Sequence, residues 1–338
     1  MTNNKTPLPI LIIGGAGVVG SAAARHLRAA HPSLPLTIGG RNLDKAQKLA
    51  EELGFASAVV VNLDVQDLGL KNEEYSGVIG ALQDLKFAGQ RFAQQRRIPF
   101  VTIYGSSATV AQDFSVFAAG PRESAVVHAS HWSGGIPTIL ALQSASELAR
   151  VDDIRILAVY DFKDAAGPMS QTEVTMDGGA PLYFRNGYFN LANDDSQKIV
   201  TAQAVDGAEI TANITAMVDS LSLGTAFPNA TSLFAVEFGD SSGTRSGSAV
   251  THDIAILVSG EDRHGSSVII RQDLVDPYGQ LDQTGLGAAL VMERVLGLDG
   301  GDAIQPGFYY PEHILQPEGV ENRVLDRGIK LTRTTSSR

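Results

Sequence analysis

Cysteine is absent from the 338 residues of this sequence. Disulfide bonds, Cys-ligated zinc or iron–sulfur centres and covalent thiol chemistry are therefore excluded. Charged residues are scarce as well, at 19%, where an average globular chain has about 25%. With 43% hydrophobic residues, the composition excludes a chain that charge keeps disordered. The length suits about two domains.

Long apolar runs are also missing, and glycines interrupt the first apolar stretch. Residues 1–8 lack the basic and apolar segments of a signal peptide, so we expect a cytoplasmic protein that binds no membrane. The net charge of −11 argues against nucleic acid as a partner. Residues 1–150 carry a net +2 and residues 151–338 a net −13, and the acidic second half favours a cationic or amine substrate.

Glycine, in contrast, is abundant, with 35 residues, and three of them form the strongest motif. Gly15, Gly17 and Gly20 have the G-x-G-x-x-G spacing between an expected strand and an expected helix. Glycine is needed there for the tight turn, for close approach of the backbone to a pyrophosphate, and for packing of the helix on the sheet. We expect these residues to bind the dinucleotide: Gly15, Ala16, Gly17, Val18, Val19 and Gly20. A glycine turn without a nucleotide is the structural alternative.

Apolar strands and helices alternate through the first half of the sequence. This order is typical of βαβ units and predicts an α/β protein with a Rossmann-type doubly wound parallel sheet. The expected strands are 9–13, 36–39, 58–61, 77–81, 100–103 and 125–128, and the expected helices are 19–30, 43–53 and 87–97.

The second half is less regular and predicts a mixed α+β domain for substrate binding and dimerisation. Its clearest strands are 154–162 and 267–274, and its clearest helices are 137–150 and 285–296. We expect the dinucleotide-binding domain over 1–128, the mixed domain over 129–300, and a segment, 301–338, that packs back on the first domain. Residues 332–338 have the composition of a disordered tail.

The choice of cofactor is made at the end of the second strand, where NAD enzymes place a carboxylate on the ribose. This chain has Gly40, Arg41 and Asn42 there, and no carboxylate before Asp44 in the following helix. Arg41 suits a 2′-phosphate, so NADP(H) is favoured and NAD(H) is the alternative. After the third strand, Asp64 either contacts the adenine or caps the next turn.

Several of these segments together resemble the saccharopine dehydrogenase-like NAD(P)-dependent oxidoreductases. The resemblance is carried by the glycine motif, residues 39–42 with the helix after them, Gly134-Gly135-Ile136-Pro137, and the ending 306–312. It covers the N-terminal domain well, the last 50 residues loosely and 155–285 only by length. It implies hydride transfer between a nicotinamide cofactor and a C=N or C–N centre, and often a homodimer. No zinc-ligand spacing is present, so no metal is expected.

The exits of the fifth and sixth strands are expected to face the nicotinamide, because ligands of open α/β sheets bind outside the carboxyl ends of the strands. Tyr104 and His131 follow these strands, with Trp132 beside them. His131 is a candidate proton donor, Tyr104 a candidate hydrogen-bonding partner, and Trp132 a substrate-binding residue that excludes water. The structural alternatives are a histidine that braces the turn and a tryptophan that fills an interface. His128 is expected to be a packed core histidine.

In the second half, Lys163 is a candidate acid or base, for which a surface lysine is the alternative, and Tyr160 is a candidate substrate contact. Arg185 suits a substrate carboxylate, although a surface salt bridge is the alternative. His252 and Asp253 are expected to form an exposed strand start, and an oriented histidine is the alternative. Two functional alternatives stay open: a carbonyl reductase of the extended short-chain type, although no Tyr-x-x-x-Lys is present, and a redox sensor that binds NADP(H) without turnover.

Overall fold

The computed structural model describes residues 7–165, 167 and 180–337. The chain forms two compact units. The first contains residues 1–105, 109–130 and 284–314, and the second contains residues 106–108, 131–283 and 315–338. Residues 284–300 thus join the first unit and residues 315–338 the second, whereas the sequence placed the boundaries at 128 and 300. Among the described helices, none has the combination of length and apolarity that crossing a bilayer requires.

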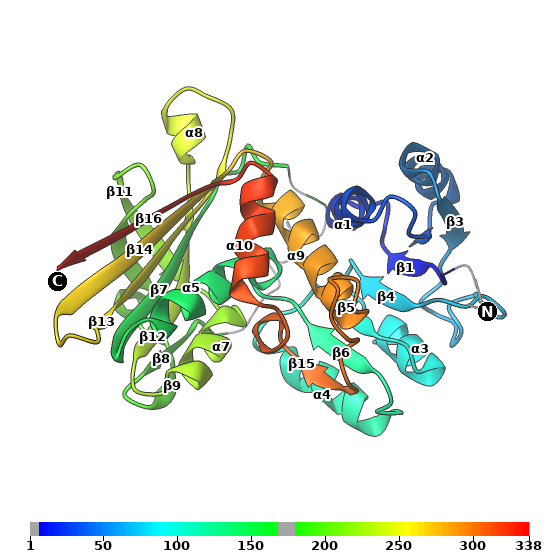
Figure 1. The fold of residues 1–338 in the computed structure, drawn as a ribbon, viewed down its shortest axis with the longest axis horizontal. Helices are drawn as coiled ribbons and strands as arrows, with labels where there is room; N and C mark the ends of the chain where they lie inside the picture. Colours follow the sequence, from blue (N-terminus) through cyan, green and yellow to red (C-terminus); the bar gives the residue numbers. More distant parts are fainter. Residues whose placement is uncertain (1–6, 166, 168–179, 338) are drawn as a thin grey trace. The chain divides into compact units, whose positions relative to one another are not determined.

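A sheet of seven parallel strands forms the centre of the first unit, in the order β15-β6-β5-β4-β1-β2-β3 (Figure 1). Its strands are β1 (Ile10–Ile13), β2 (Leu36–Gly40), β3 (Ala56–Val60), β4 (Gly77–Gly80), β5 (Phe100–Thr102), β6 (Ala125–His128) and β15 (Gly307–Tyr309). β1 lies between β2 and β4, so the chain changes direction across the sheet beside β1. This is the doubly wound order, and the expected fold class is confirmed.

Helices follow β1, β2, β4 and β5, and a further helix precedes β15, whereas β3 leads to β4 without a helix. They are α1 (Val18–Ala30), α2 (Leu43–Leu53), α3 (Ala88–Arg96), α4 (Val110–Ala119) and α9 (Gln280–Val295). α9 packs closely on α1, since a Cβ at Gly285 would lie 2.5 Å from the Cβ of Ala22. β15 and α9 therefore return to the first unit from late in the chain, and β15 pairs with β6.

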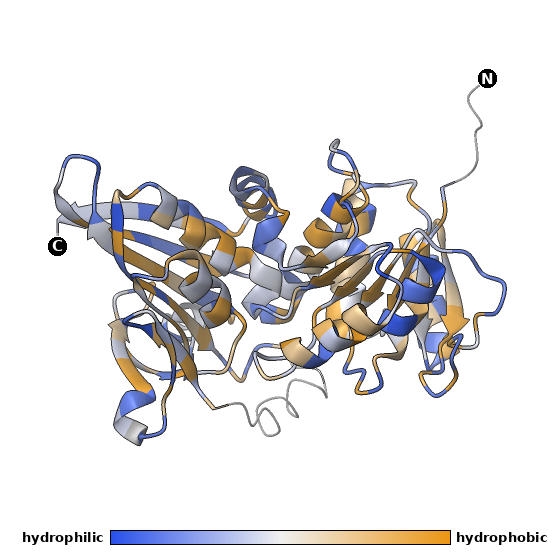
Figure 2. Cartoon of the chain, turned by 90° about the horizontal axis from the view of Figure 1, so that it is seen from below, coloured by the Kyte–Doolittle hydropathy of each residue, from blue (hydrophilic) through white to orange (hydrophobic). Residues whose placement is uncertain are grey.

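The core of the first unit lies between the sheet and these helices. Figure 2 shows its strands largely in the orange of hydrophobic residues, as expected for strands covered on both faces. One cluster joins Leu11 and Val78 of the sheet to Phe92 of α3 and Phe117 of α4. These side chains are almost fully buried, so α3 and α4 are held on one face of the sheet.

The second unit has a mixed sheet with the main order β10-β11-β12-β7-β13-β14-β16, and β8 and β9 extend it from β12. Its strands are β7 (Arg150–Tyr160), β8 (Leu182–Arg185), β9 (Tyr188–Leu191), β10 (Ile199–Gln203), β11 (Glu209–Ile214), β12 (Thr231–Phe238), β13 (His252–Glu261), β14 (Ser267–Asp276) and β16 (Lys330–Ser337). Its helices are α5 (Ile136–Ser146), α7 (Asp219–Ala226), α8 (Ser242–Arg245) and α10 (Pro317–Asp326). Only β7 and β12 are parallel neighbours among the pairs described, which makes this the expected mixed domain.

Two expectations about this unit were wrong. Residues 332–337 are not a disordered tail but part of β16, which pairs with β14 over eight residue pairs. Their polar composition fits an edge strand that is exposed over most of its length. The helix expected over 137–150 ends at Ser146, because β7 already begins at Arg150.

Candidate functional site

The glycine motif forms the turn from β1 to α1. Gly14 has a φ of +77°, which favours glycine, and a Cβ there would lie 2.7 Å from the carbonyl oxygen of Ala81. A Cβ at Gly15 would lie 2.7 Å from the carbonyl oxygen of Ile12, and one at Gly20 would lie 2.4 Å from that of Gly14. The turn is therefore built from backbone alone, and side chains are excluded from its inner surface.

The N-terminus of α1 is open. Gly17 is its N-cap, and no side chain among the described residues accepts a hydrogen bond there. The first N–H groups of a helix have no partners within the helix, and together with the helix dipole they attract anions. Val18, the first residue of α1, is 40% exposed, so this end of the helix is accessible. The turn and the helix end thus fit a pyrophosphate.

The exit of β2 carries Arg41 and Asn42, and the first carboxylate after the strand is that of Asp44 in α2. Asn42 caps α2, since its side-chain oxygen accepts a hydrogen bond from the Lys45 N–H at 2.9 Å. Asp44 lies in the first turn of the same helix. Arg41 is exposed and forms no hydrogen bond or ion pair with any described side chain. Gly40 has no atom within 4 Å of the position of a Cβ, so the backbone before Arg41 is open.

Asp64 lies in the loop after β3 and pairs with Lys86. The Lys86 ammonium lowers the pKa of the Asp64 carboxyl, whose side chain is 73% exposed. Its backbone N–H is bonded to the side-chain oxygen of Asn62 at 2.9 Å. Among the described contacts, therefore, it is Asn62 that stabilises the turn, and the carboxylate of Asp64 is directed to Lys86.

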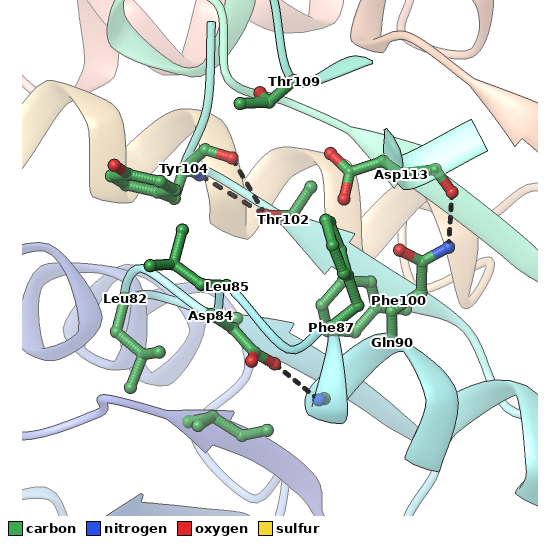
Figure 3. Close-up of a pocket in the computed structure, with 13 residues that line it drawn as sticks. Leu82, Asp84, Leu85, Phe87, Gln90, Phe100, Thr102, Tyr104, Thr109 and Asp113 are labelled. Carbon is green, nitrogen blue, oxygen red and sulfur yellow. Dashed lines mark hydrogen bonds between the residues drawn. The ribbon is translucent and has the colours of Figure 1, made fainter. Parts of the chain in front are cut away.

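Tyr104 lines a cavity of about 50 Å³ at the carboxyl ends of β4 and β5 (Figure 3). Its hydroxyl accepts a hydrogen bond from the Gln83 side chain. Thr102, at the end of β5, lines the same cavity and is hydrogen-bonded to the backbone of Tyr104 at 3.4 Å. The exit of the fifth strand thus borders a cavity within the first unit.

His131 and Trp132 belong to the second unit, in a turn with an unusual backbone. Ser133, Gly134 and Gly135 have φ values of 51°, 63° and 96° in succession. Two glycines tolerate this conformation, and Pro137 then lies in the first turn of α5, where it needs no hydrogen-bond partner. The sequence Ser-Gly-Gly-Ile-Pro is therefore explained by this left-handed turn into the helix.

His131 is 3% exposed, and its Nε2 lies 2.8 Å from the hydroxyl of Ser222. The neighbouring Asp219 is fully buried and accepts hydrogen bonds from the Trp132 N–H at 2.9 Å and from the Thr138 hydroxyl at 2.6 Å. Burial raises the pKa of Asp219, although the charge of His131 and these hydrogen bonds act in the opposite direction. His131 thus lies in a buried polar network that joins η1 (Trp132–Gly135), α5 and α7.

The indole of Trp132 continues this network to the second sheet. Its Nε1–H donates to Nε2 of His252 at 2.9 Å, and the two rings are 5.8 Å apart. Burial lowers the pKa of His252 to about 3, so the ring is a neutral acceptor. The expectation that His252 and Asp253 are exposed was wrong, because both side chains are buried and hydrogen-bonded.

The other candidates of the second unit differ in their surroundings. Tyr160 lies edge to face with Trp132, with ring centroids 6.4 Å apart. Lys163 is exposed, and its Nζ lies 3.0 Å from Asp240. Arg185 is exposed at the end of β8. The structure therefore brings Trp132, Tyr160 and His131 into one region and leaves Lys163 and Arg185 at the surface.

Asp161 is a buried carboxylate that the sequence did not single out. It accepts hydrogen bonds from the N–H and hydroxyl of Ser241, from the hydroxyl of Thr244 and from the Lys163 N–H. Burial alone would raise its pKa, but these donors lower it to about 2. Asp161 therefore stays ionised and fixes the N-terminus of α8, which is a structural role. The sequence analysis also missed Asp219, Ser222 and Asp113. Their partners, Trp132 and Thr138, His131, and His128 respectively, are distant along the chain and come close only in the folded structure.

Comparison with known proteins gives the fold but no family. No family model and no curated protein matches the sequence. Among solved structures, saccharopine dehydrogenase (L-Glu forming) from Saccharomyces cerevisiae is similar with a TM-score of 0.71 and 14% identity, over 98% of this chain and 100% of the other. A meso-dapdh mutant with DAP from Clostridium tetani has a TM-score of 0.51 and 12% identity, over 93% of this chain and 99% of the other.

An oxidoreductase from Agrobacterium radiobacter in complex with NAD⁺, L-tartaric acid and magnesium has a TM-score of 0.51 and 10% identity, over 98% of both chains. The chain thus has the fold of a class of two-domain dehydrogenases. The predicted resemblance to saccharopine dehydrogenase is confirmed at the level of the fold over nearly the whole chain.

Proposed function

We propose that this protein is an NADP(H)-dependent oxidoreductase that transfers hydride at a C=N or C–N centre. The observation that carries the proposal is the nucleotide site of the first unit, a backbone-only glycine turn that leads into an uncapped helix N-terminus. The similarity of the whole chain to saccharopine dehydrogenase supports C–N chemistry. The similarity to the Agrobacterium radiobacter oxidoreductase, whose structure is a complex with NAD⁺, supports a nicotinamide cofactor.

The residues of the first unit would hold the cofactor in two places. Residues 15–20 would bind the pyrophosphate through backbone N–H groups. Arg41 would bind the 2′-phosphate through its planar guanidinium, with Gly40 leaving the approach open and Asn42 fixing the helix start. Asp64, next to Lys86, stays a proposed contact at the adenine end. When bound, NADP(H) supplies or accepts the hydride, which is chemistry that no side chain provides.

The proton of the reaction would come from a side chain of the protein. When an imine is reduced, its carbon gains the hydride, its nitrogen gains a proton and the C=N π bond is lost. We assign the proton to His131, whose ring is oriented by Ser222, and hydrogen bonding of the substrate to Tyr104. Trp132 and Tyr160 offer an aromatic surface that excludes water. We also propose Lys163 as a second proton donor or acceptor and Arg185 as the residue that binds a substrate carboxylate. Both side chains are exposed.

The cofactor assignment is tested by replacing Arg41. A charge-assisted bond to phosphate contributes about 1.5–3 kcal/mol, so Arg41→Ala should weaken NADPH binding about 10- to 100-fold and leave NADH binding unchanged. Arg122→Ala is the matched control, since Arg122 is also an exposed arginine of the first unit. Titration of cofactor fluorescence measures both constants. Equal loss of NADPH and NADH affinity, or no loss, would refute the 2′-phosphate assignment.

The reaction is tested by NADPH consumption with ketones, aldehydes and cyclic imines, with and without added amines. Dependence on the amine, or turnover of the imines alone, indicates C–N chemistry, whereas turnover of carbonyls alone indicates the carbonyl reductase. His131→Gln should lower kcat without changing NADPH binding, and His264→Gln, an exposed histidine of the same unit, should change neither. A homodimer stays a prediction, which light scattering checks as twice the mass of the chain.

A further inference from the structure

The cavity beside β4 and β5 has polar groups that the proposed function does not use. It lies within the first unit, between the ends of these strands and the first turns of α3 and α4. Its walls are largely apolar, with polar groups among them (Figure 3). The lining residues are Ile13, Gly80, Leu82, Asp84, Leu85, Phe87, Gly89, Gln90, Phe100, Thr102, Tyr104, Thr109 and Asp113.

Gln90 of α3 presents an acceptor that has no partner. The side chain is 1% exposed, and its Nε2 donates to the carbonyl oxygen of Asp113 at 3.0 Å. Its Oε1 is buried and has no hydrogen bond within the described chain. This bond fixes the amide, so its oxygen is directed away from α4 and toward Phe87 in Figure 3. A buried acceptor without a donor destabilises the folded chain, and a ligand that donates to it would remove this cost.

Asp113 of α4 presents a second acceptor. It is 6% exposed, and one of its carboxylate oxygens lies 2.6 Å from Nδ1 of His128. His128 is fully buried, as the sequence predicted, and packs against the rings of Phe308 and Tyr310. The imidazole therefore holds the carboxylate in place. In Figure 3 the carboxylate points toward the side of the cavity where Thr102 and Thr109 lie.

The charge of the cavity has one sign. Asp113 and Asp84 both line it, and none of the described lining residues is Lys, Arg or His. Asp84 is already bonded to the N–H groups of Lys86 and Gly89 at the start of α3. An anion is thus disfavoured, whereas a cation with several N–H donors would satisfy Gln90 and Asp113 together.

We propose that this cavity binds the primary ammonium group of a small amine, held by Asp113 and the Gln90 side-chain oxygen. Phe87 and Phe100 supply apolar surface for the carbon chain next to the charge. A neutral carboxamide would also donate to Gln90, but it brings no positive charge to the buried Asp113 carboxylate, whose described charged neighbour is His128. As the site of the amine substrate, the assignment rests on the proposed function; as a binding site, it rests on the cavity.

The test is calorimetric titration of the full chain with methylammonium, tetramethylammonium and acetamide at constant ionic strength. Methylammonium should bind, and the other two should bind at least tenfold more weakly, because one lacks N–H donors and the other lacks charge. Asp113→Asn should raise the Kd for methylammonium about tenfold or more, and Gln90→Met about fivefold. Glu51→Gln and Gln47→Met make the same chemical changes on the exposed surface of α2 and should have no effect.

Three results would overturn the site: no methylammonium binding, equal or tighter binding of tetramethylammonium or acetamide, or a Kd unchanged by both Asp113→Asn and Gln90→Met. NADPH binding and thermal melting of each variant report its folding, and Gln90→Met carries the test if Asp113→Asn does not fold. Methylammonium binding without NADPH binding would retain the site and refute the proposed function. Amine-dependent NADPH turnover, with a KM for the amine that neither variant changes, would support the proposed function and refute the site.

Discussion

Gly20 and Gly319 hold the same position in two helices, since each is the third residue of its helix, α1 and α10. In an open helix, alanine is up to about 1 kcal/mol more favourable than glycine. A Cβ at Gly319 would have no atom within 4 Å, so Gly319→Ala should stabilise the second unit by up to about 1 kcal/mol.

Gly20 should respond with the opposite sign. A Cβ there would lie 2.4 Å from the carbonyl oxygen of Gly14 and 2.8 Å from Cα of Gly15, and both atoms belong to the backbone of the turn. Overpacking of this kind costs about 1–3 kcal/mol, which exceeds the gain in helix propensity. We therefore expect Gly20→Ala to lower the free energy of unfolding of the first unit by about 1–2 kcal/mol, and to weaken NADPH binding because the turn must shift.

Scanning calorimetry is the suitable assay, because it follows both units. A change of 1 kcal/mol should move the melting temperature of a unit of this size by about 2–4 °C. Gly20→Ala should melt below the wild type and Gly319→Ala at or above it. A Gly20→Ala protein that melts with the wild type and binds NADPH equally well would refute the close approach of α1 to the turn.

Three further outcomes follow from buried side chains of the second unit. Burial raises the pKa of Asp276 to about 6, so the native state binds more protons than the unfolded chain between about pH 4 and 6, and stability falls as pH rises through this window. Asp276→Asn should therefore be more stable relative to wild type at pH 7.5 than at pH 4.5, by about 2–3 kcal/mol in urea unfolding; an equal difference at both values contradicts this. The pKa of Asp161 is instead lowered to about 2, and its contribution is present above about pH 4 and lost as pH falls through 2. Asp161→Asn should accordingly lower the free energy of unfolding by about 2 kcal/mol at pH 7 and by progressively less in acid. The urea unfolding curves of variant and wild type should therefore converge as the pH falls. Finally, His252 stays neutral beside the only tryptophan, so emission of Trp132 between pH 8 and 5 should have the same profile in wild type and His252→Gln, and a transition seen only in the wild type would show that His252 titrates.

The nucleotide half of the fold was predictable because its signals are local. Residues 10–13 are a short apolar run between Pro9 and Gly14, and the glycine spacing fixes both the turn and the start of α1. Arg41 and Asn42 follow β2 directly, so their position at the end of the strand needed only the strand itself. In each case neighbours along the chain are also neighbours in space.

The late elements were not predictable in this way. β15 is three residues long and exists because it pairs with β6, and β16 is a polar strand that exists because it pairs with β14. α4 was missed as well, although it supplies Asp113 and Phe117 to the first unit. A strand at the edge of a sheet takes its stability from its partner, and its own residues carry little pattern.

By itself, then, the sequence determined the doubly wound sheet, the glycine turn and the absence of thiol chemistry, since these depend on residue types and short spacings. The tertiary structure decided which polar side chains are buried together. His131 meets Ser222 and Trp132 meets His252 across 91 and 120 positions of the chain. No local pattern encodes such pairs, because what selects them is the cost of leaving a buried polar group without a partner, and burial exists only after folding.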